Sequence, residues 1–312
     1  MKNLNTYITE YIIKKKLDKP IDSEYHCTYF PETKEELIKN IKELLDKEET
    51  NLNCIDTSEI TDMSNLFNQN VTKIIIPVNI NISKWDVSNV TDMRYMFAYC
   101  KKFNGNLSKW NVSNVENMMG MFGFCESFEG KGIDKWNVSN VTNMLSMFNR
   151  CLKFNCDLSN WDVSNVTNMR SMFNSCEKFK GKGLENWDVS NVTNMSGMFN
   201  RCLNFNCDLS KWDVSKVEYI TYMFNNCKNF NGSVSGWNVS KIKDMMAVFY
   251  GCNNFTGNGL ETWDVSNVED MQFMFYDCKN LNCDLSKWNV SNVADMDSMF
   301  NNVKSEPNWY KY

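Results

Sequence analysis

The sequence predicts an α/β repeat solenoid, in which each repeat of 25–26 residues contributes one short parallel strand and one short helix. Tryptophan recurs nine times at steps of 25 or 26 residues, and each is followed by Asp or Asn, then Val, then Ser. Such a period is typical of stacked repeats, because one unit is too small to bury its own apolar side chains. The nine tryptophans are Trp85, Trp110, Trp136, Trp161, Trp187, Trp212, Trp237, Trp263 and Trp288.

The predicted helix of each repeat follows the tryptophan motif. In one copy Val166, Met169, Phe173 and Cys176 are spaced i, i+3, i+7 and i+10, which places them on one stripe of a helix, and Met172 widens that stripe. The residues between them differ from copy to copy, which indicates a side that faces solvent. Because such a helix has only about two turns, it depends on its neighbours in the stack.

A short strand is predicted before each tryptophan. Phe154, Cys156 and Leu158 alternate with other residues, as on a strand with one buried face. A strand plus a short helix in every repeat is leucine-rich-repeat-like, with Phe, Met, Trp and Val in the apolar positions. Successive strands would then pair in parallel, about 4.8 Å apart. Three repeats carry an extra residue in a sequence that predicts a bulge: Gly130/Gly132, Gly181/Gly183 and Gly257/Gly259.

The N-terminal part of the chain divides into two segments. Residues 1–32 are an amphipathic segment and linker. Residues 33–50 are predicted to be a helical cap on the first repeat, because Thr33 and Glu36 form a capping box before an apolar helix face.

The solenoid itself is predicted to span residues 51–303, with about ten repeats. Its first repeat is degenerate and carries an extra loop around Pro77. Residues 304–312 are an aromatic segment that we expect to fold over the open C-terminal end, since the terminal repeats of solenoids are atypical.

Polar positions also line up when repeats stack. The Asp or Asn after each tryptophan is predicted to form a local turn, because these side chains bond to the backbone two residues further on. A row of carboxylates is alternatively a calcium site, but the Gly-Gly-x-Gly-x-Asp repeat of calcium-binding solenoids is absent. We therefore expect no metal and no cofactor.

The chain has 13 cysteines, eight of them at one repeat position. We interpret this set as small buried side chains, with disulfides or a metal site as alternatives. No CxxC pair occurs, which argues against zinc. An odd number of mostly unpaired thiols favours a reducing compartment. The set is Cys100, Cys125, Cys151, Cys176, Cys202, Cys227, Cys252 and Cys278.

Composition limits the partners and the location. The net charge is −5 and no basic patch stands out, so a nucleic-acid partner is not expected. No apolar run of membrane-spanning length occurs. Lysines interrupt the N-terminal segment where a secretory signal needs its apolar core, so we expect a cytoplasmic or otherwise reducing location. We expect a monomer that binds a protein.

The candidate binding residues are aromatic side chains on the outward side of the predicted helices. Exposed aromatics on a rigid scaffold are typical of interface hot spots. The alternative is the strand face, which presents polar residues such as Asn104, Asn106, Asp157 and Asp208. The predicted partner-binding residues are Tyr95, Tyr99, Phe124, Tyr222, Tyr250, Phe273 and Tyr276.

The repeat WDVSNVTNMxxMFxxCxxFNxDLSxW, which covers about residues 50–303, resembles that of the BspA-like leucine-rich-repeat surface proteins. It is similar in particular to a variant named from mycoplasma lipoproteins of unknown function. The resemblance implies a leucine-rich-repeat-type solenoid that binds proteins or surfaces, and it supplies no catalytic residues. It also implies a cell-surface location as the alternative, although this chain shows no signal peptide or lipobox.

Three classes of function remain at this point. A non-enzymatic repeat scaffold for protein–protein interaction is favoured, with a cell-surface adhesin as its exported form. A phage or viral structural protein is the second class, because MKNLNTYITE resembles the leader of phage internal head proteins, which is cleaved after a site such as Ile8-Thr9-Glu10. An enzyme is not expected, since a single histidine provides no His-based dyad and no cofactor motif occurs.

Overall fold

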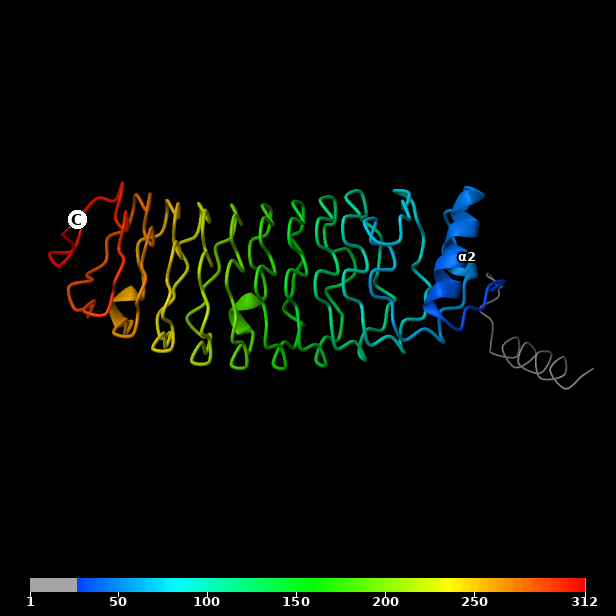
Figure 1. Cartoon of the computed structure of the whole chain (residues 1–312), viewed down its shortest axis with the longest axis horizontal. Coiled ribbons are helices and arrows are strands. Elements are labelled where there is room, and N and C mark those ends of the chain that lie inside the picture. The colour runs from blue at the N-terminus through cyan, green and yellow to red at the C-terminus, as the bar shows by residue number, and fades with distance from the viewer. Residues whose placement is uncertain (1–26, 312) are drawn as a thin grey trace, which may run out of the picture.

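A computed structural model of the protein describes residues 27–311, which coil into one elongated stack of repeats (Figure 1). The helix α2, Lys34–Asp46, lies at one end of the stack and the C-terminus lies at the other. Most of the predicted N-terminal segment 1–32, including the cleavage site after Glu10, lies outside the described residues.

Neighbouring repeats are joined by an eight-residue stretch that we call the ladder segment, Asn168–Ser175 in one copy. Every second N–H group of this stretch donates to a carbonyl of the next repeat, at 2.7–3.0 Å. The first residue of each ladder segment forms an isolated parallel bridge with its counterpart in the next repeat, except at one junction described below. The four bonds of this copy are Met169 to Asn194, Ser171 to Ser196, Phe173 to Met198 and Ser175 to Asn200.

The helix predicted in each repeat is wrong. Met172 and Cys176 donate their N–H groups three residues back, to Met169 and Phe173, in consecutive β-turns. Ser171 and Ser175 have φ angles of 54° and 60°, a left-handed conformation that no α-helix contains. Within residues 27–311 the only helices are α2 and three single-turn 3₁₀ helices: η1, Leu52–Cys54; η2, Leu184–Asn186; and η3, Leu260–Thr262.

The predicted strand is also misplaced. Most of the parallel bridges lie in the ladder segment, and within the described residues the stretch before a tryptophan contributes one, between Asn51 and Asn81. In that stretch Leu158 donates to Lys182 of the next repeat at 3.1 Å, but Trp161 donates back to Leu158 in a tight turn. The fold is therefore a parallel repeat solenoid built from turns and single bridges, and its α/β description does not hold in the part of the chain that the structure describes.

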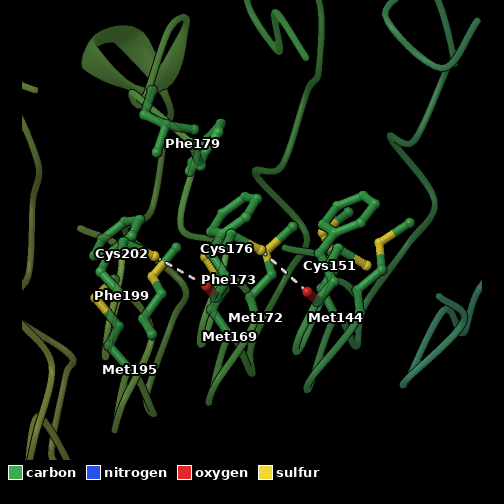
Figure 2. Close-up of a cluster of buried hydrophobic side chains, with 14 of the residues drawn as sticks. Met144, Cys151, Met169, Met172, Phe173, Cys176, Phe179, Met195, Phe199 and Cys202 are labelled. Atoms are coloured by element: carbon green, nitrogen blue, oxygen red, sulfur yellow. Dashed lines mark hydrogen bonds between the residues drawn. The ribbon is translucent and has the colours of Figure 1, made fainter. Parts of the chain in front are cut away.

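The predicted core is confirmed by burial. Val166, Met169, Phe173 and Cys176 are each 0% exposed. Phe173 stacks between Phe148 and Phe199 at centroid distances of 5.6 and 5.8 Å, and Figure 2 shows Phe173 beside Phe199. Equivalent ring pairs continue this apolar column from Phe67 to Phe300. Each tryptophan ring is buried as well, and its Nε1–H donates to a backbone carbonyl of the preceding repeat, as Trp161 does to Ile133 at 2.9 Å.

The cysteines at the common repeat position are buried, as predicted, and each also makes a hydrogen bond. The Cys176 thiol donates to the carbonyl of Phe148 at 3.1 Å, and the Cys202 thiol donates to that of Phe173 at 2.9 Å (Figure 2). All eight make the equivalent bond to the preceding repeat, at 2.9–3.2 Å. Most of these carbonyls also accept a backbone N–H bond in their own repeat, as Phe148 does from Cys151 at 2.9 Å, so the thiol supplies a second hydrogen bond that links neighbouring repeats.

The turn-forming role of the residue after tryptophan is confirmed. Asp162 accepts from the N–H of Ser164 at 3.0 Å, and the same bond occurs in all nine copies of the motif. Such a bond orders the corner that follows the tryptophan and turns the chain toward the ladder segment.

Both ends of the stack are covered in the structure. At the N-terminal end Thr33 accepts from the N–H of Glu36 at 3.2 Å, and α2 buries Leu37 and Ile41 in the common core. At the C-terminal end Trp309 donates to the carbonyl of Leu285 at 2.8 Å, which repeats the bond made by the tryptophan of every repeat. Tyr312, the last residue of the predicted aromatic segment, lies outside the described residues.

Candidate functional site

The seven predicted aromatic residues lie in ladder segments, on side chains that point away from the core. We call this surface the ladder face; it replaces the helix face that the sequence predicted. None of the seven belongs to the fully buried core, and Tyr99 and Tyr222 are the most open, at 36% and 42% exposure. The structure brings these residues together in two groups.

The N-terminal aromatic cluster consists of Tyr95, Tyr99 and Phe124. The rings of Tyr99 and Phe124 stack at 4.6 Å, and the Arg150 guanidinium lies 5.4 Å from the centroid of Phe124. The Tyr95 hydroxyl lies 2.9 Å from the sulfur of Met119 in the next repeat. Stacked aromatic pairs contribute about 0.5–1.5 kcal/mol beyond their buried area, so this cluster is a pre-ordered apolar surface.

The C-terminal aromatic cluster consists of Tyr222, Tyr250, Phe273 and Tyr276. Tyr250 and Tyr276 stack at 4.8 Å with their planes 7° apart, and Phe273 packs at a tilt against Tyr276 at 6.2 Å. The Tyr222 hydroxyl lies 2.9 Å from the sulfur of Met246, which matches the contact of Tyr95 with its own neighbour. The two clusters thus have similar construction.

Several of these aromatic residues have a left-handed backbone conformation, which is unfavourable for bulky side chains. The φ angles are 54° at Tyr95, 67° at Tyr99, 64° at Phe124, 59° at Tyr222 and 55° at Phe273. For bulky side chains a left-handed backbone is an outlier, and it costs about 1–2 kcal/mol. Asn, Ser or Gly take the same positions in other repeats, as Asn65 and Asn226 do. The fold alone therefore does not call for aromatic rings at these positions.

Tyr219 is an exposed aromatic that the sequence prediction missed. It is 54% exposed, more than any of the seven predicted residues. It is the first residue of its ladder segment, where the other repeats have Asp or Asn. The equivalent Asn194 accepts from the N–H of Ser196 at 3.0 Å, a bond that a tyrosine cannot make. The available signal was this single departure from an otherwise regular Asx position.

The ladder is interrupted beside Tyr219. Tyr219 bridges back to Asn194, and Asp244 bridges forward to Asp270, but no bridge joins Tyr219 to Asp244 in the described chain. A groove of about 660 Å³ lies at this junction, lined by Tyr219 with Glu218, Lys241, Lys243, Asp244 and Glu269 among others.

The groove at the interruption carries charges of both signs. Lys243 pairs with Glu269 at 2.7 Å, and this hydrogen bond with its attraction raises the pKa of Lys243. Burial raises the pKa of Asp244, and the nearby Asp270 adds to that shift. The groove therefore combines an open tyrosine with a paired lysine and a partly desolvated carboxyl group.

Apolar side chains of the extra loop in the first repeat adjoin the N-terminal cluster. Val71, Ile75 and Val78 are 60%, 78% and 66% exposed. A hollow of about 380 Å³ lies between this loop and Tyr99, lined also by Phe103. The loop was predicted around Pro77, but its apolar tip was not recognised as part of a surface.

The alternative strand face is used by the fold itself. Asn104 accepts from the N–H of Glu129 at 3.1 Å, and Asn106 accepts from that of Ser108 at 3.0 Å. Asp157 and Asp208 accept from serine N–H groups in the same way, at 3.0 and 2.9 Å. The Lys182 ammonium beside Asp157 lowers the pKa of that carboxyl to about 2. These polar atoms hold turns and neighbouring repeats together, so substituting them also weakens the fold.

None of the helices in the described part of the chain has the length and hydropathy of a membrane span. Among residues 27–311 no group of three or more histidine, cysteine or acidic side chains is arranged to hold a metal ion.

A comparison with curated proteins finds no match. Among solved structures, a leucine-rich repeat protein from Eubacterium ventriosum is 13% identical over 88% of this chain and 89% of its own, with a TM-score of 0.33. A TLR13–ssRNA13 complex is 11% identical over 80% of this chain, with a TM-score of 0.26, and this chain spans 40% of that one.

The family comparison covers most of the sequence. A model of one family matches residues 35–159, 125–183, 146–258 and 231–308 in overlapping stretches. These matches follow the repeats from α2 to the C-terminal segment, as expected for a motif that recurs along the whole stack. The chain therefore belongs to the family described as Mycoplasma protein of unknown function, DUF285.

Proposed function

We propose that the protein is a non-enzymatic scaffold that binds a protein partner through its ladder face. The observation that carries the proposal is the pair of aromatic clusters, which lie on one face of a rigid stack and include residues in a disfavoured backbone conformation. Other repeats have the same backbone angle with small residues such as Ser171 and Ala247, so the fold does not require aromatic rings there. Clustered tyrosines and phenylalanines with an adjacent arginine are also the composition of interface hot spots.

A cell-surface adhesin of the BspA-like type is a narrower form of this proposed scaffold. We favour instead a reducing compartment, because the thiol–carbonyl hydrogen bonds of the eight stacked cysteines need reduced sulfur atoms.

The test uses substitutions that remove aromatic rings without straining the fold. Asn suits a left-handed backbone, and this chain already has Asn65 and Asn226 at the two equivalent positions. Tyr99→Asn and Tyr222→Asn should therefore fold normally and lose the partner. Lys109→Asn, an exposed change outside the ladder segments, is the matched control.

The measurement is quantitative affinity purification from the cells that express the protein, followed by mass spectrometry and by binding assays with the purified partner. We expect both tyrosine variants to bind the partner at least about tenfold more weakly than the wild type, and Lys109→Asn to bind equally well. A partner held equally by all four proteins would show that the ladder face is not the binding surface.

A further inference from the structure

The ladder segments between the two aromatic clusters carry only basic charges. Three successive repeats place Arg150, Arg170 and Arg201 there, and all three side chains are exposed. The ladder segments of these repeats, 143–150, 168–175 and 194–201, contain no Asp or Glu. This contrasts with the whole chain, whose net charge is −5.

The three guanidinium groups are available for a ligand. None of them forms an ion pair within residues 27–311, although seven other basic side chains there do. The one contact of their charged ends is that of Arg150 with the ring of Phe124. The basic stretch is thus continuous with the N-terminal aromatic cluster.

A hollow separates two of these arginines. Arg150 and Arg201 hold the same position in their repeats, and the repeat between them has the short Ser175 there. Ser175 is only 8% exposed, and a hollow of about 380 Å³ lies between the two arginines, lined also by Leu152, Leu203, Glu177 and Lys228. Its three basic side chains outnumber the one carboxylate, which favours an acidic ligand group there, and Arg binds carboxylates in a two-bonded geometry.

The spacing of the clusters limits the shape of the ligand. Rings of adjacent repeats stack at 4.6 and 4.8 Å on this face, in agreement with the separation of paired strands, about 4.8 Å. Four such steps lead from the repeat of Phe124 to that of Tyr222, a distance of about 19 Å. An extended peptide rises about 3.3 Å per residue. About six residues therefore span the interval.

We propose that the ligand is an extended segment of a partner protein, with an apolar side chain at each end of a stretch of about six residues and carboxylates between them. The inference rests on the proposed function and names the chemistry of its partner. The end side chains pack on the two aromatic clusters, and the acidic side chains pair with Arg150 and Arg201 across the hollow. The segment runs along the axis of the stack, so it crosses several repeats.

A single-stranded nucleic acid is the competing ligand, since bases also stack on aromatic rings beside arginines. The charge of the chain favours the peptide. Nucleic-acid affinity comes mainly from several phosphate contacts, whereas three arginines lie on this face between the two clusters and the molecule as a whole is acidic. Oligonucleotide binding is therefore one of the outcomes that the experiment has to separate.

The experiment measures binding of fluorescent peptides to the full chain by anisotropy. The test peptide has a tryptophan at each end of a glutamate-containing spacer of about six residues. One control peptide replaces the glutamates by lysines, and another brings the two tryptophans next to each other. A uridine oligonucleotide of similar length is the third control. We expect the test peptide to bind about tenfold or more tightly than each control, and added salt to weaken its binding.

Substitutions then assign the contacts. Arg150→Asn and Arg201→Asn suit the local backbone, whose φ is 61° at both positions. Their combination should abolish the preference for glutamate over lysine while leaving a weak affinity for the tryptophans. Lys109→Asn should change nothing. Equal binding of the test peptide and the lysine peptide to the wild type would overturn the inference, as would tighter binding of the oligonucleotide or no binding of any peptide.

Failure of the acidic-segment inference can be distinguished from failure of the proposed scaffold function. If a purified partner is lost with Tyr222→Asn but not with the double arginine variant, the scaffold function stands and the acidic-segment inference falls. If the partner is retained by both tyrosine variants, the ladder face itself is excluded and both proposals fall.

Discussion

Gly181 lies directly against Cys207 of the next repeat. A Cβ atom on Gly181 would lie 2.8 Å from the Cβ of Cys207 and 2.6 Å from the ring of Phe205, and Gly181 has a φ of 87°. The same contact joins Gly130 to Cys156 and Gly257 to Cys283. Each repeat with a Gly-x-Gly sequence is therefore followed by one with a cysteine that fills the space beside the first glycine.

Replacement of Gly181 should destabilise the protein. Gly181→Ala introduces both a disfavoured backbone angle and a clash with the next repeat, so we expect a loss of about 2–4 kcal/mol in the free energy of unfolding. Gly197→Ala is the control. Gly197 has a φ of 61°, a left-handed angle like that of Ser171, and an added Cβ would have the Ser171 hydroxyl oxygen as its nearest neighbour, at 3.3 Å. Denaturant unfolding in which both variants lose the same stability would contradict the packing argument.

The phenylalanine column should show a large effect of truncation. Phe173 is fully buried and contacts Phe179 at 4.4 Å in addition to its stacked neighbours. Phe173→Ala should cost about 3–5 kcal/mol, as deletions of buried rings do. Arg170→Ala, on the exposed side of the same ladder segment, should stay within about 0.5 kcal/mol. A loss below about 1 kcal/mol for Phe173→Ala would be incompatible with its place in the core.

The stacked thiols should make stability fall at alkaline pH. Burial raises the pKa of Cys100 to about 12 and that of Cys176 well above its ordinary value. The folded state then keeps protons that unfolded thiols lose above about pH 8.5. Each buried thiol therefore lowers the free energy of unfolding by about 1.4 kcal/mol per pH unit above that point.

Unfolding titrations under reducing conditions, between neutral pH and the alkaline range, measure this dependence. Cys176→Ala removes one thiol, so the fall of the unfolding free energy with rising pH should become shallower by about 1.4 kcal/mol per pH unit. This change is expected whatever the variant does to stability at neutral pH. The native protein should also react slowly with a thiol reagent, because the thiolate is scarce and covered. Stability that stays constant through the alkaline range would mean that the thiols are not buried.

Aromatic residues in the left-handed positions should be replaceable by asparagine at little cost. Tyr222→Asn loses ring contacts worth about 0.5–1.5 kcal/mol and relieves backbone strain of similar size. We therefore expect its free energy of unfolding to stay within about 1 kcal/mol of the wild type. Tyr222→Val, with a β-branched side chain in the same conformation, should be clearly less stable. Equal stability of the two variants would argue against the φ of 59°.

The local turn bond that is missing at Tyr219 should be restored by a single substitution. Tyr219→Asn restores the Asx side chain found at this position in the other repeats, and it should accept from the N–H of Thr221. One added hydrogen bond stabilises by about 0.5–1.5 kcal/mol. The reverse change, Asn194→Tyr, removes the bond to Ser196 and should destabilise by a similar amount. Thermal unfolding of both variants checks the two signs, and a less stable Tyr219→Asn would refute the role given to Tyr219.

The period, the burial and the turns after tryptophan could all be predicted from residue types. An Asp or Asn followed two residues later by Ser forms the same local bond wherever it occurs, so Asp162 and Ser164 needed no tertiary information. The apolar spacing around Met169 and Phe173 likewise identified the buried side chains correctly. It did not identify the backbone, because consecutive β-turns in a solenoid place residues three and four apart on one side just as a helix does.

The candidate site could be predicted only in part. The seven aromatic residues were found because they depart from their repeats, but their grouping into two clusters depends on contacts between repeats. Tyr99 and Tyr222 have left-handed angles and donate their N–H groups to the following repeat, and no local sequence pattern reveals either feature. Arg150 and Arg201 stand 51 residues apart in the sequence, and only the stack shows that they face one hollow.

The contact of Gly181 with Cys207 also restricts how an array of this kind can change in length. A repeat of 26 residues with the Gly-x-Gly sequence and the 25-residue repeat that follows it form a matched pair of 51 residues. Loss of one member by a genetic deletion would set a glycine beside a residue that does not fit it, or a cysteine beside an occupied space. Within these pairs, insertions and deletions keep every such contact only when they add or remove both members, whereas the 25-residue repeat that ends at Trp237 belongs to no pair and is free of this restriction.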